Sequence, residues 1–336
     1  MNYKIITSPQ QKKVESFLGM FDYICPFQTI SIYGSLSQTL SYRSEKIFAS
    51  NSSGDVVGLL SFILKREYNV PFFSPYFSHS MIRGGPLISS KVDREKVTEL
   101  LLTEYVKRVS KSCVYSRIYN LYNPEMISSL RQKGFTHDNY FDVLVNISKG
   151  KNKLWSKLAK NRRNGITKSK RLGVKVSFSE NINDMKKAYS LFKYAHIKYN
   201  HPFPSYSVFD DIFFNLIKKG RSKLLIAKLD KEIISSVLLL CSNSYVYYWF
   251  GGNLPGFRKY NANELLIWEA IEWGSAKGYT IFDFGGAGNE TSKIGIRKFK
   301  EQFGSFTINF GSLTLVHNPT FFRLLNFGKE FLIKSR

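Results

Sequence analysis

An internal repeat covers nearly the whole length of this chain and constrains its fold more than any other feature. Each half is predicted to contain helices, a β-hairpin, a strand, a helix, a strand, a short helix and a last strand, in that order. Three pairs of segments match in order and spacing: SNSSGDVVGLLSF with AKLDKEIISSVLLL, KVTELLLTEYVKRVSKSCVYSRI with NELLIWEAIEWGSAKGYTIFDF, and LRQKGFTHDNYFDVLV with IRKFKEQFGSFTINFG. A strand-helix-strand unit in a mostly antiparallel sheet is typical of mixed α/β domains. The repeat therefore predicts an α/β fold with mixed sheets and two domains, residues 1–148 and 149–336.

Hydrophobic periodicity and turn residues place the elements within each half. Phe135 to Ile147 is expected to form the last strand of the first half, and Ser305 to Phe310 that of the second. Tyr245 to Phe250 is expected to be an aromatic strand and Tyr279 to Phe284 a short buried strand. Helices are expected at residues 10–20, 93–110, 154–173, 181–199, 206–219 and 265–273. After the buried strand, glycines at 285, 286 and 288 allow the backbone to turn tightly or to lie against a ligand.

The formal net charge of +24 favours polyanionic partners, namely nucleic acid, phosphorylated precursors or an anionic membrane surface. A Lys-rich overall composition is the alternative explanation. The excess is concentrated between Asp142 and Glu180, where the chain has 11 Lys or Arg residues and no acid. This stretch is either a solvated helix face or an anion-binding segment anchored by Trp155.

The sequence indicates an intracellular protein. Its three cysteines are far apart and lack metal-ligand spacing, so they are expected to be reduced and buried. The N-terminus has no apolar signal region, and no apolar run is long enough to span a bilayer. The expected location is the cytoplasm or the inner membrane surface. The basic amphipathic tail, Pro319 to Arg336, would either dock on its own domain or lie on anionic lipid.

The motifs of this chain resemble those of the Fem (FemABX) family of tandem acetyltransferase-like (GNAT) acyl- and aminoacyltransferases. The resemblance covers nearly the whole chain and rests most on Gly295-Ile-Arg-Lys-Phe-Lys-Glu-Gln-Phe-Gly304. Weaker supporting motifs are Leu154-Trp155, Asn161-Arg162-Arg163, Gly173-Val174, Tyr247-Tyr-Trp-Phe-Gly-Gly252, Phe282-Asp-Phe-Gly-Gly286, Pro26-Phe-Gln-Thr29 and Arg83-Gly-Gly-Pro86.

The resemblance implies two GNAT-like domains and transfer of an acyl or aminoacyl group to an amine. The donor would be aminoacyl-tRNA or acyl-CoA, with no permanently bound cofactor. The acceptor would be a nucleotide- or lipid-linked precursor, bound on the side of the first domain. Some family members carry a coiled-coil arm in the second domain. Residues 181–221 are too short for such an arm, so this chain resembles the compact members.

Three residues are candidates for catalysis. The resemblance places Lys300 at the junction of donor and acceptor, where it would support the developing negative charge, and Phe299 at the wall of the channel. On periodicity alone, Phe299 is a core anchor and Lys300 a solvated helix residue. Asp283, at the end of the buried strand, would orient the amine or accept its proton. Alternatively, its carboxylate caps the amides of Gly285 and Gly286.

Further residues are candidates for binding the substrates. Arginine and lysine side chains suit phosphate groups. The candidates are Arg162, Arg163, Arg297, Lys298 and Tyr248 in the second half, and Arg83, Gln28 and Tyr33 in the first. No metal site is expected, because His196 and His201 lack a third ligand nearby.

The segment Arg258–Asn263 occupies the place of the phosphate-cradling loop of CoA-dependent GNAT enzymes. Asn261 and Asn263 replace the small residues that let pyrophosphate approach the backbone there. This difference favours a tRNA-linked donor, or CoA bound in another way. The leading hypothesis is thus an aminoacyltransferase that forms an amide on a cell-envelope precursor, of peptidoglycan or a surface polysaccharide. The alternatives are a CoA-dependent N-acetyltransferase acting on an amino sugar, and a non-catalytic tRNA- or membrane-binding protein.

Overall fold

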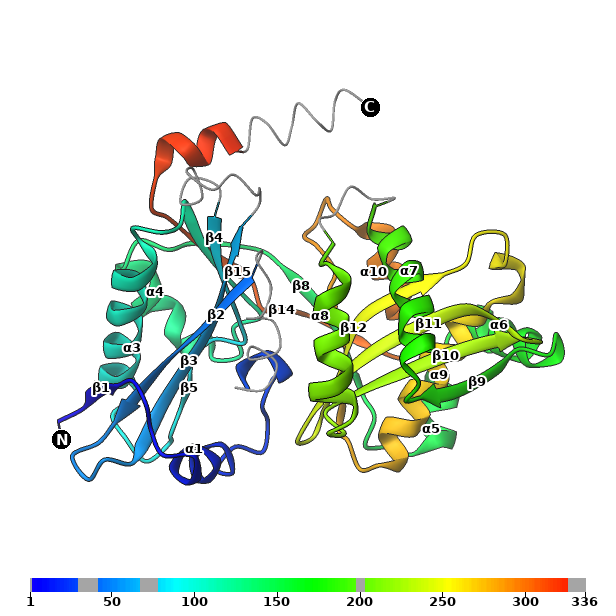
Figure 1. Ribbon diagram of the computed structural model, residues 1–336, viewed down its shortest axis with the longest axis horizontal. Coiled ribbons are helices and arrows are strands. Elements are labelled where there is room, and N and C mark those ends of the chain that lie inside the picture. Colours follow the sequence, from blue (N-terminus) through cyan, green and yellow to red (C-terminus); the bar gives the residue numbers. More distant parts are fainter. Residues whose placement is uncertain (1, 30–41, 67–77, 198–202, 326–336) are drawn as a thin grey trace. The chain divides into compact units, whose positions relative to one another are not determined.

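The computed structural model describes residues 2–29, 42–66, 78–197 and 203–325, which form two compact units (Figure 1). Unit 1 comprises Met1–Asp22, Phe27–Tyr140 and Phe310–Arg336, and unit 2 comprises Tyr23–Pro26 and Phe141–Asn309. The units are therefore not two consecutive halves of the chain. The domain division expected from the repeat lay at residue 148, whereas the chain passes from unit 1 to unit 2 after Tyr140 and returns after Asn309.

Among the described strands of unit 1, the sheet is antiparallel except for the parallel pair β4 with β6. Its spatial order is β1 (Lys4–Ile6), β2 (Tyr42–Ser50), β3 (Val56–Arg66), β4 (Ser78–Arg83), β6 (Tyr115–Tyr119), β15 (Ser312–Val316) and β7 (Thr136–Asp138), with β5 (Leu87–Ile88) paired to β3. The helical elements are α1 (Gln11–Leu18), η1 (Pro26–Gln28), α3 (Arg94–Val109), η3 (Pro124–Met126) and α4 (Ile127–Gln132).

Helix α3 provides much of the core of unit 1. It begins after Asp93, whose side chain accepts a hydrogen bond from the Lys96 amide at 3.1 Å, as expected of an N-cap aspartate. Val97, Leu101 and Tyr105 are fully buried on the side that packs against β2 and β3. Burial of each such side chain contributes about 1.5–3 kcal/mol relative to exposure.

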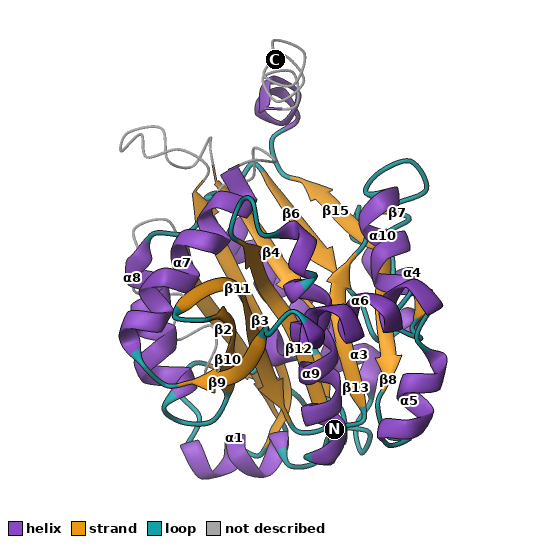
Figure 2. Cartoon of the chain, turned by 90° about the vertical axis from the view of Figure 1, so that its right-hand side faces the viewer, coloured by secondary structure: helices purple, strands orange, loops and turns teal. Residues whose placement is uncertain are grey.

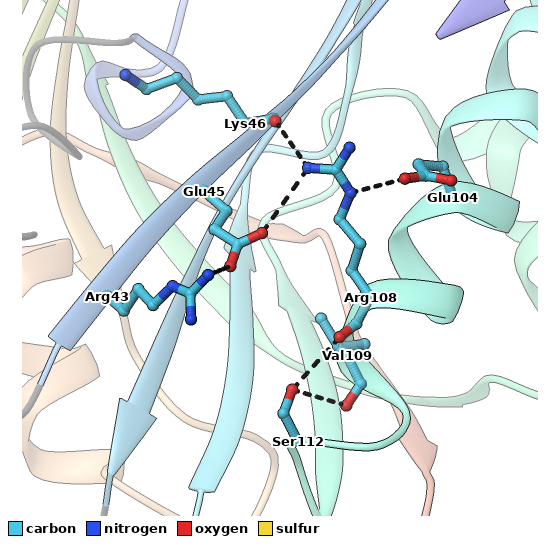
Figure 3. Close-up of polar contacts among 7 residues, drawn as sticks. All are labelled: Arg43, Glu45, Lys46, Glu104, Arg108, Val109 and Ser112. Carbon is cyan, nitrogen blue, oxygen red and sulfur yellow. Dashed lines mark hydrogen bonds and ion pairs between the residues drawn. The ribbon is translucent and has the colours of Figure 1, made fainter. Parts of the chain in front are cut away.

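Ion pairs at the C-terminal end of α3 fix the helix against β2 (Figure 3). The Nε atom of Arg108 donates to Glu104 at 2.8 Å, and its Nη1 atom lies 3.8 Å from the Glu45 carboxylate and 3.5 Å from the Lys46 carbonyl oxygen. Arg43 binds the other oxygen of Glu45 at 2.8 Å. Partly exposed pairs of this kind contribute at most about 1 kcal/mol each, so they orient the helix more than they stabilise it.

The sheet of unit 2 repeats this topology, and β12 with β13 is the parallel pair among its described strands. Its spatial order is β14 (Phe306–Asn309), β8 (Phe141–Asn146), β13 (Ile281–Gly286), β12 (Tyr245–Asn253), β11 (Glu232–Ser242), β10 (Ser222–Leu229) and β9 (Lys175–Ser179). The helical elements are α5 (Lys151–Lys157), α6 (Lys160–Arg171), α7 (Ile182–Ile197), α8 (Tyr206–Ile212), the π-helical turn η4 (Phe213–Ile217), η5 (Arg258–Tyr260), α9 (Ala262–Ala276) and α10 (Ile294–Glu301).

Helices cover both faces of the unit 2 sheet (Figure 2). Leu225, Val237 and Leu239 belong to the core that contains α9, whereas their neighbours Leu224 and Leu238 are buried on the other face. Helix α7 packs against β11 and β12. A strand buried on both faces reads as a continuous apolar run, which explains the sequences of β10 and β11.

The final segment of each half contributes a strand to the sheet of the other unit, because β8 joins the sheet of unit 2 and β15 joins that of unit 1. The prediction of one strand from Phe135 to Ile147 is wrong, because β7 belongs to the sheet of unit 1 and β8 to that of unit 2. The second half likewise has two strands where one was expected, since β14 is followed by β15, which lies between β6 and β7. Gly311, with a φ of +70°, forms the turn between β14 and β15, and its amide donates to the Tyr140 carbonyl oxygen at 3.2 Å.

Two other expected helices differ from the structure. The segment 154–173 forms two helices instead of one, because the backbone is extended at Leu158 (ψ 141°) between α5 and α6. In the tail, residues 319–325 are helical, and Phe321, Phe322 and Leu325 pack against Val114 and Tyr115 of the same unit. The rest of the predicted tail helix lies outside the described residues. Within the described ranges, no helix is both long enough and apolar enough to cross a membrane.

Candidate functional site

The turn at the end of β13 is the centre of the candidate site in unit 2. Strand β13 pairs with β8 from Ile281 to Asp283, and the register then shifts so that Gly286 lies opposite Asp142. Gly285 within this irregularity has a φ of +70°, a conformation that side-chain-bearing residues rarely adopt. A Cβ atom on Gly285 would also lie 2.5 Å from the Tyr247 hydroxyl. The turn therefore requires glycine for both backbone and packing reasons.

The side chain of Lys300, on α10, binds this turn. Its ammonium group donates to the carbonyl oxygens of Phe284 at 2.8 Å and of Gly285 and Gly286 at 3.0 Å each. An ammonium group has three donors, so all of them have an acceptor. Burial lowers the pKa of Lys300 to about 8, against the opposing effect of the carboxylates of Asp142 and Asp283. Lys300 is therefore not the solvated helix residue that periodicity alone predicts.

Asp283 is fully buried beside the same turn. Its Oδ1 atom accepts a hydrogen bond from the Gly285 amide at 2.5 Å, which is the capping contact expected under the structural interpretation. Its Oδ2 atom accepts from the Tyr245 hydroxyl. Burial and the nearby Asp142 raise the pKa of Asp283 well above its usual range. A carboxyl group that holds its proton in this way is poorly suited to act as a general base.

Phe299 and Arg162 form a second contact on α10. The Arg162 guanidinium lies 4.5 Å from the centre of the Phe299 ring and donates to Gln302 at 2.7 Å and to Glu264 at 2.9 Å. Phe299 also packs against Phe303, with ring centroids 5.4 Å apart. These contacts attach α6 to α9 and α10, so Phe299 and Arg162 have structural roles in unit 2.

Two of the remaining candidates of unit 2 donate hydrogen bonds to backbone carbonyl oxygens, and a third is exposed. Arg163 donates to the carbonyl oxygens of Ser156 and Leu158, at 3.1 and 2.5 Å. Arg297 donates to the Asn289 carbonyl oxygen at 2.6 Å. Lys298 is exposed and free to reach a ligand.

Tyr248 and Asp142 lie inside unit 2. Burial raises the pKa of Tyr248, and its ring packs at 6.1 Å from that of Phe284. Its hydroxyl occupies the space beside Gly251 where a Cβ atom would lie. Asp142 was not among the sequence candidates, although it is fully buried and close enough to Asp283 and Lys300 to influence the pKa of both. One signal could have identified it, namely a lone acid within the apolar strand β8.

The candidates of unit 1 meet at the end of β4. Gln28 is buried, and its amide donates to the carbonyl oxygens of Gly84 and Gly85 at 3.1 and 2.9 Å. The Arg83 guanidinium lies 5.0 Å from the ring of Phe27 and 5.5 Å from that of Tyr119. Gln28 thus anchors the turn that follows Arg83. The third candidate, Tyr33, lies outside the described residues.

The N-terminus of α9 is covered by α6, which lies beside it (Figures 1 and 2). Asn261 precedes the helix with a φ of +51° and makes no side-chain capping hydrogen bond. A Cβ atom added to Gly165 of α6 would lie 3.7 Å from the Asn261 side chain, which is ordinary van der Waals contact. In the first turn, Glu264 forms an ion pair with Arg162 at 2.9 Å. The helix end that would attract a phosphate therefore already has a carboxylate and a helix against it.

In the described part of the chain, no three His, Cys, Asp or Glu side chains form a group that could hold a metal ion.

Sequence comparison relates parts of the chain to known transferases. Residues 156–300 match the family described as the acetyltransferase (GNAT) domain. The lipid II:glycine glycyltransferase of Staphylococcus aureus (strain USA300) is 27% identical over 108 residues, which are 31% of this chain and 26% of that protein. The enzyme of the same name from Staphylococcus epidermidis is 25% identical over 137 residues, 38% of this chain and 33% of that protein. The chain thus matches a third or less of the length of these relatives.

Solved structures relate the whole fold to known proteins. FemX has a TM-score of 0.73 and 15% identity, with 96% of this chain and 99% of FemX covered. Over nearly its whole length, the chain therefore has the same fold as FemX. The tandem GNAT protein from the clavulanic acid biosynthesis pathway has a TM-score of 0.60 and 9% identity, covering 95% and 99% of the two chains. L-PGS from Bacillus licheniformis has a TM-score of 0.58 and 14% identity, covering 98% of each chain.

These comparisons confirm two predictions for this chain, namely its resemblance to Fem proteins and the mixed α/β fold with two GNAT-like units. The GNAT match includes both Arg162 and Lys300. The matched region ends at α10, the helix whose lysine binds the turn after β13.

Proposed function

We propose that this protein is an aminoacyltransferase of the Fem type that forms an amide bond on an amine of a peptidoglycan precursor. One combined observation carries the proposal: the chain has the fold of FemX over nearly its whole length, and about a third of its sequence matches lipid II:glycine glycyltransferases. A lipid-linked acceptor would bring the protein to the inner membrane surface as a peripheral protein. A nucleotide-linked acceptor would leave it in the cytoplasm.

The end of α9 favours aminoacyl-tRNA over acyl-CoA as the donor. In a CoA-dependent GNAT enzyme, the pyrophosphate needs free backbone amides and close access at this helix N-terminus. Here Asn261 takes the left-handed conformation, α6 covers the helix end, and Glu264 adds a negative charge beside Arg162. A carboxylate at this position would repel pyrophosphate.

The outer side of α6 supports the same choice. Lys160, Asn164, Lys168 and Arg171 recur at intervals of three or four residues and are exposed. We call these four residues the α6 stripe. With a rise of 1.5 Å per residue the stripe extends over about 16 Å. Among the described residues, none of its three cations takes part in an ion pair, whereas Lys170 on the same helix pairs with Glu269 at 2.8 Å. Unpaired cations in a row suit the phosphates of an RNA backbone.

In the proposed reaction, Lys300 supplies positive potential from behind the turn after β13. The neutral amine of the acceptor attacks the ester carbonyl of the donor, and negative charge develops on the carbonyl oxygen. The ester C–O bond then breaks, the amide forms, and the proton lost by the amine goes to the departing tRNA hydroxyl. The three donors of Lys300 already have acceptors in the turn, so its effect on that charge is electrostatic and positional. Arg83, at the end of β4, is the proposed contact for an anionic acceptor in unit 1.

The proposal is tested by product formation with purified components. The protein is incubated with lipid II or its nucleotide-linked precursor, together with either charged tRNA or acetyl-CoA, and products are analysed by mass spectrometry. We expect a mass increase of one aminoacyl residue with charged tRNA and none with acetyl-CoA. Acetylation of an amino sugar with acetyl-CoA would instead support the CoA-dependent alternative, which the GNAT domain match also allows. Binding of tRNA or lipid without any product would support the non-catalytic alternative.

A further inference from the structure

On β4 and β6, the sheet of unit 1 has one apolar face and one face that carries arginine and tyrosine side chains. Side chains alternate between the two faces along a strand. Ile82 and Ile118 are fully buried in the core that contains α3. Their neighbours Arg83, Arg117 and Tyr119 are partly exposed on the opposite face. Arg83 and Tyr119 lie beside each other in the parallel pair of strands, so these three side chains are neighbours on one surface of unit 1.

The Tyr119 ring lies close to both guanidinium groups. The Cζ atom of Arg83 is 5.5 Å from the ring centre, and that of Arg117 is 6.0 Å from it. Arg117 also lies 5.4 Å from the centre of the Tyr115 ring. Because both guanidinium groups are within 6.0 Å of one ring centre, they are close enough for a single ligand with two linked anionic groups to contact both.

Arg117 is held in place by neutral groups. Its Nε atom donates to the Thr314 hydroxyl at 3.1 Å, and its Nη1 atom donates to the Tyr119 hydroxyl at 3.4 Å. A guanidinium has five N–H donors. Within the described part of the chain, the remaining donors of Arg117 have no acceptor, and no carboxylate forms an ion pair with it. Against the lowering effect of burial, Tyr119, Tyr115 and Asp138 raise the pKa of Arg117, so the side chain keeps its charge.

Arg162 of unit 2 shows how an arginine with a similar ring contact is satisfied when its role is structural. Its guanidinium lies over the Phe299 ring, and it also pairs with Glu264 and donates to Gln302. Arg117 has the ring contacts without such a pair, on an interior strand of the sheet between β4 and β15. A cation–π contact at a partly exposed site is weak, so it does not account for this placement of the charge. An anionic ligand would supply the partner.

We propose that Arg117, next to Arg83, binds the diphosphate of the acceptor. This rests on the proposed function, in which the acceptor is lipid II or its nucleotide-linked precursor. Both molecules carry a diphosphate between the sugar and its carrier. The planar fork of an arginine matches the oxygen atoms of a phosphoryl group and donates two hydrogen bonds to it. Arg117 contacts one phosphoryl group, and Arg83 contacts the other.

Nuclear magnetic resonance of the full chain, with arginine labelled by ¹⁵N, tests this anion site without a transfer reaction. The Nε–H signal of Arg117 is identified by its absence from the Arg117→Gln variant. Addition of inorganic pyrophosphate should shift this signal and leave that of Arg131 unchanged. Arg131 is exposed on α4, whose Leu130 packs into the core on the opposite face of the sheet. Equal shifts of the two signals, or no shift at Arg117, would mean unspecific ion binding and overturn the proposal.

Calorimetric titration then compares ligands with and without the diphosphate. The wild-type protein should bind the nucleotide-linked precursor about tenfold or more tightly than Arg117→Gln does, because hydrogen bonds to a charged group are lost. The same sugar-peptide with its diphosphate removed should bind both proteins equally. Arg117→Lys keeps the charge without the fork and should fall between them.

Arg131→Gln is the matched control and should bind both ligands as the wild type does. A loss in Arg117→Gln that is equal for the two ligands would show that Arg117 holds another part of the acceptor or the fold itself. Either result would overturn the contact to the diphosphate.

A short-chain, soluble analogue of lipid II distinguishes the two carriers. A loss of affinity in Arg117→Gln with both the lipid-linked and the nucleotide-linked ligand supports a contact to the diphosphate that they share. A loss with only one of them supports a contact to the diphosphate on that carrier.

Failure of the proposed function has a different outcome from failure of this inference. If the proposed function is wrong, the wild type forms no product and binds no sugar-peptide ligand, while pyrophosphate still shifts the Arg117 signal. If the inference is wrong, the wild type and Arg117→Gln form product with the same KM for the acceptor.

Discussion

The Nζ atom of Lys300 lies 3.0 Å from the carbonyl oxygen of Gly285, and the same ammonium group donates to the carbonyl oxygens of Phe284 and Gly286. A backbone turn that presents three carbonyl groups to one cation is repulsive without that cation. The lysine therefore stabilises the turn and, through it, the position of β13 relative to α10.

Replacing Lys300 by methionine should lower the transfer rate about 100-fold, a typical loss when one electrostatic contact of a transition state is removed. Lys300→Arg should not restore the rate, because a planar guanidinium cannot direct three donors to converging carbonyl oxygens as an ammonium does. The measurement is the initial rate of amide formation, with Lys231→Met as the control because Lys231 is exposed in the β10–β11 turn. Full activity of Lys300→Met would contradict the proposed role of Lys300 in the transfer reaction.

The pH dependence of the wild-type protein should reflect the depressed pKa of Lys300, about 8. Above that pH the side chain loses its charge, so the transfer rate, corrected for hydrolysis of the donor ester, should fall. The free energy of unfolding, in contrast, should rise over the same pH range. The unfolded chain holds this proton up to about pH 10.4, so it binds more protons than the folded state between pH 8 and that value.

In that range, the free energy of unfolding of the wild type should gain a positive contribution from Lys300 as pH rises. The difference between wild type and Lys300→Met, measured by urea unfolding at pH 7, 9 and 10, isolates this contribution. A difference that stays constant over these pH values would mean that the lysine titrates normally.

Gly285→Ala should destabilise the protein more than Gly278→Ala does. Both glycines have a positive φ, of +70° and +81°, and the backbone strain of an alanine there costs about 1 kcal/mol. Only the Cβ atom at position 285 would meet a neighbour, the Tyr247 hydroxyl at 2.5 Å, whereas the space around Gly278 is open. Urea unfolding measures both losses. Tyr247→Phe should recover part of the extra loss, and equal losses at the two positions would refute the steric argument.

The repeat in the sequence predicts most of this fold, because each half carries its own hairpin and strand-helix-strand unit with local periodicity. The hairpin from Val56 and the helix after Asp93 follow directly from turn and cap residues. The exchange of β8 and β15 could not be predicted in this way. The apolar alternation runs on from Phe135 to Ile147, and which sheet each part joins depends on partners far away in the chain.

The same exchange explains what was missed in the candidate site. Lys300 and Asp283 could be identified from the family motif and from the position of Asp283 before a glycine turn. The sequence marks Asp142 only as a lone acid in an apolar strand, because its proximity to Asp283 depends on the pairing of β8 with β13. The side chains of Arg162 and Arg163 suit phosphate by type, yet in the structure they bind Glu264, Gln302 and backbone carbonyl oxygens. Charge patterns do not tell which cations are already paired.

Unpaired cations of α6 should therefore matter more for tRNA binding than paired ones. The triple variant Lys160→Gln, Lys168→Gln, Arg171→Gln removes the cations of the α6 stripe. The control Lys151→Gln, Lys170→Gln removes two cations that pair with Glu272 at 2.5 Å and Glu269 at 2.8 Å. Fluorescence anisotropy with labelled tRNA at several salt concentrations gives the affinity and its salt dependence for each protein.

The triple variant should bind more weakly than the control and lower the slope of log K against log[salt] by about 2, since each phosphate contact contributes roughly 0.7 to 0.9. The control should change the slope little, because Lys151 and Lys170 are paired with glutamates and their loss removes no unpaired cation. Circular dichroism checks that α6 is intact in both. A slope that changes equally in the two variants would show that net charge, rather than the stripe, attracts the RNA.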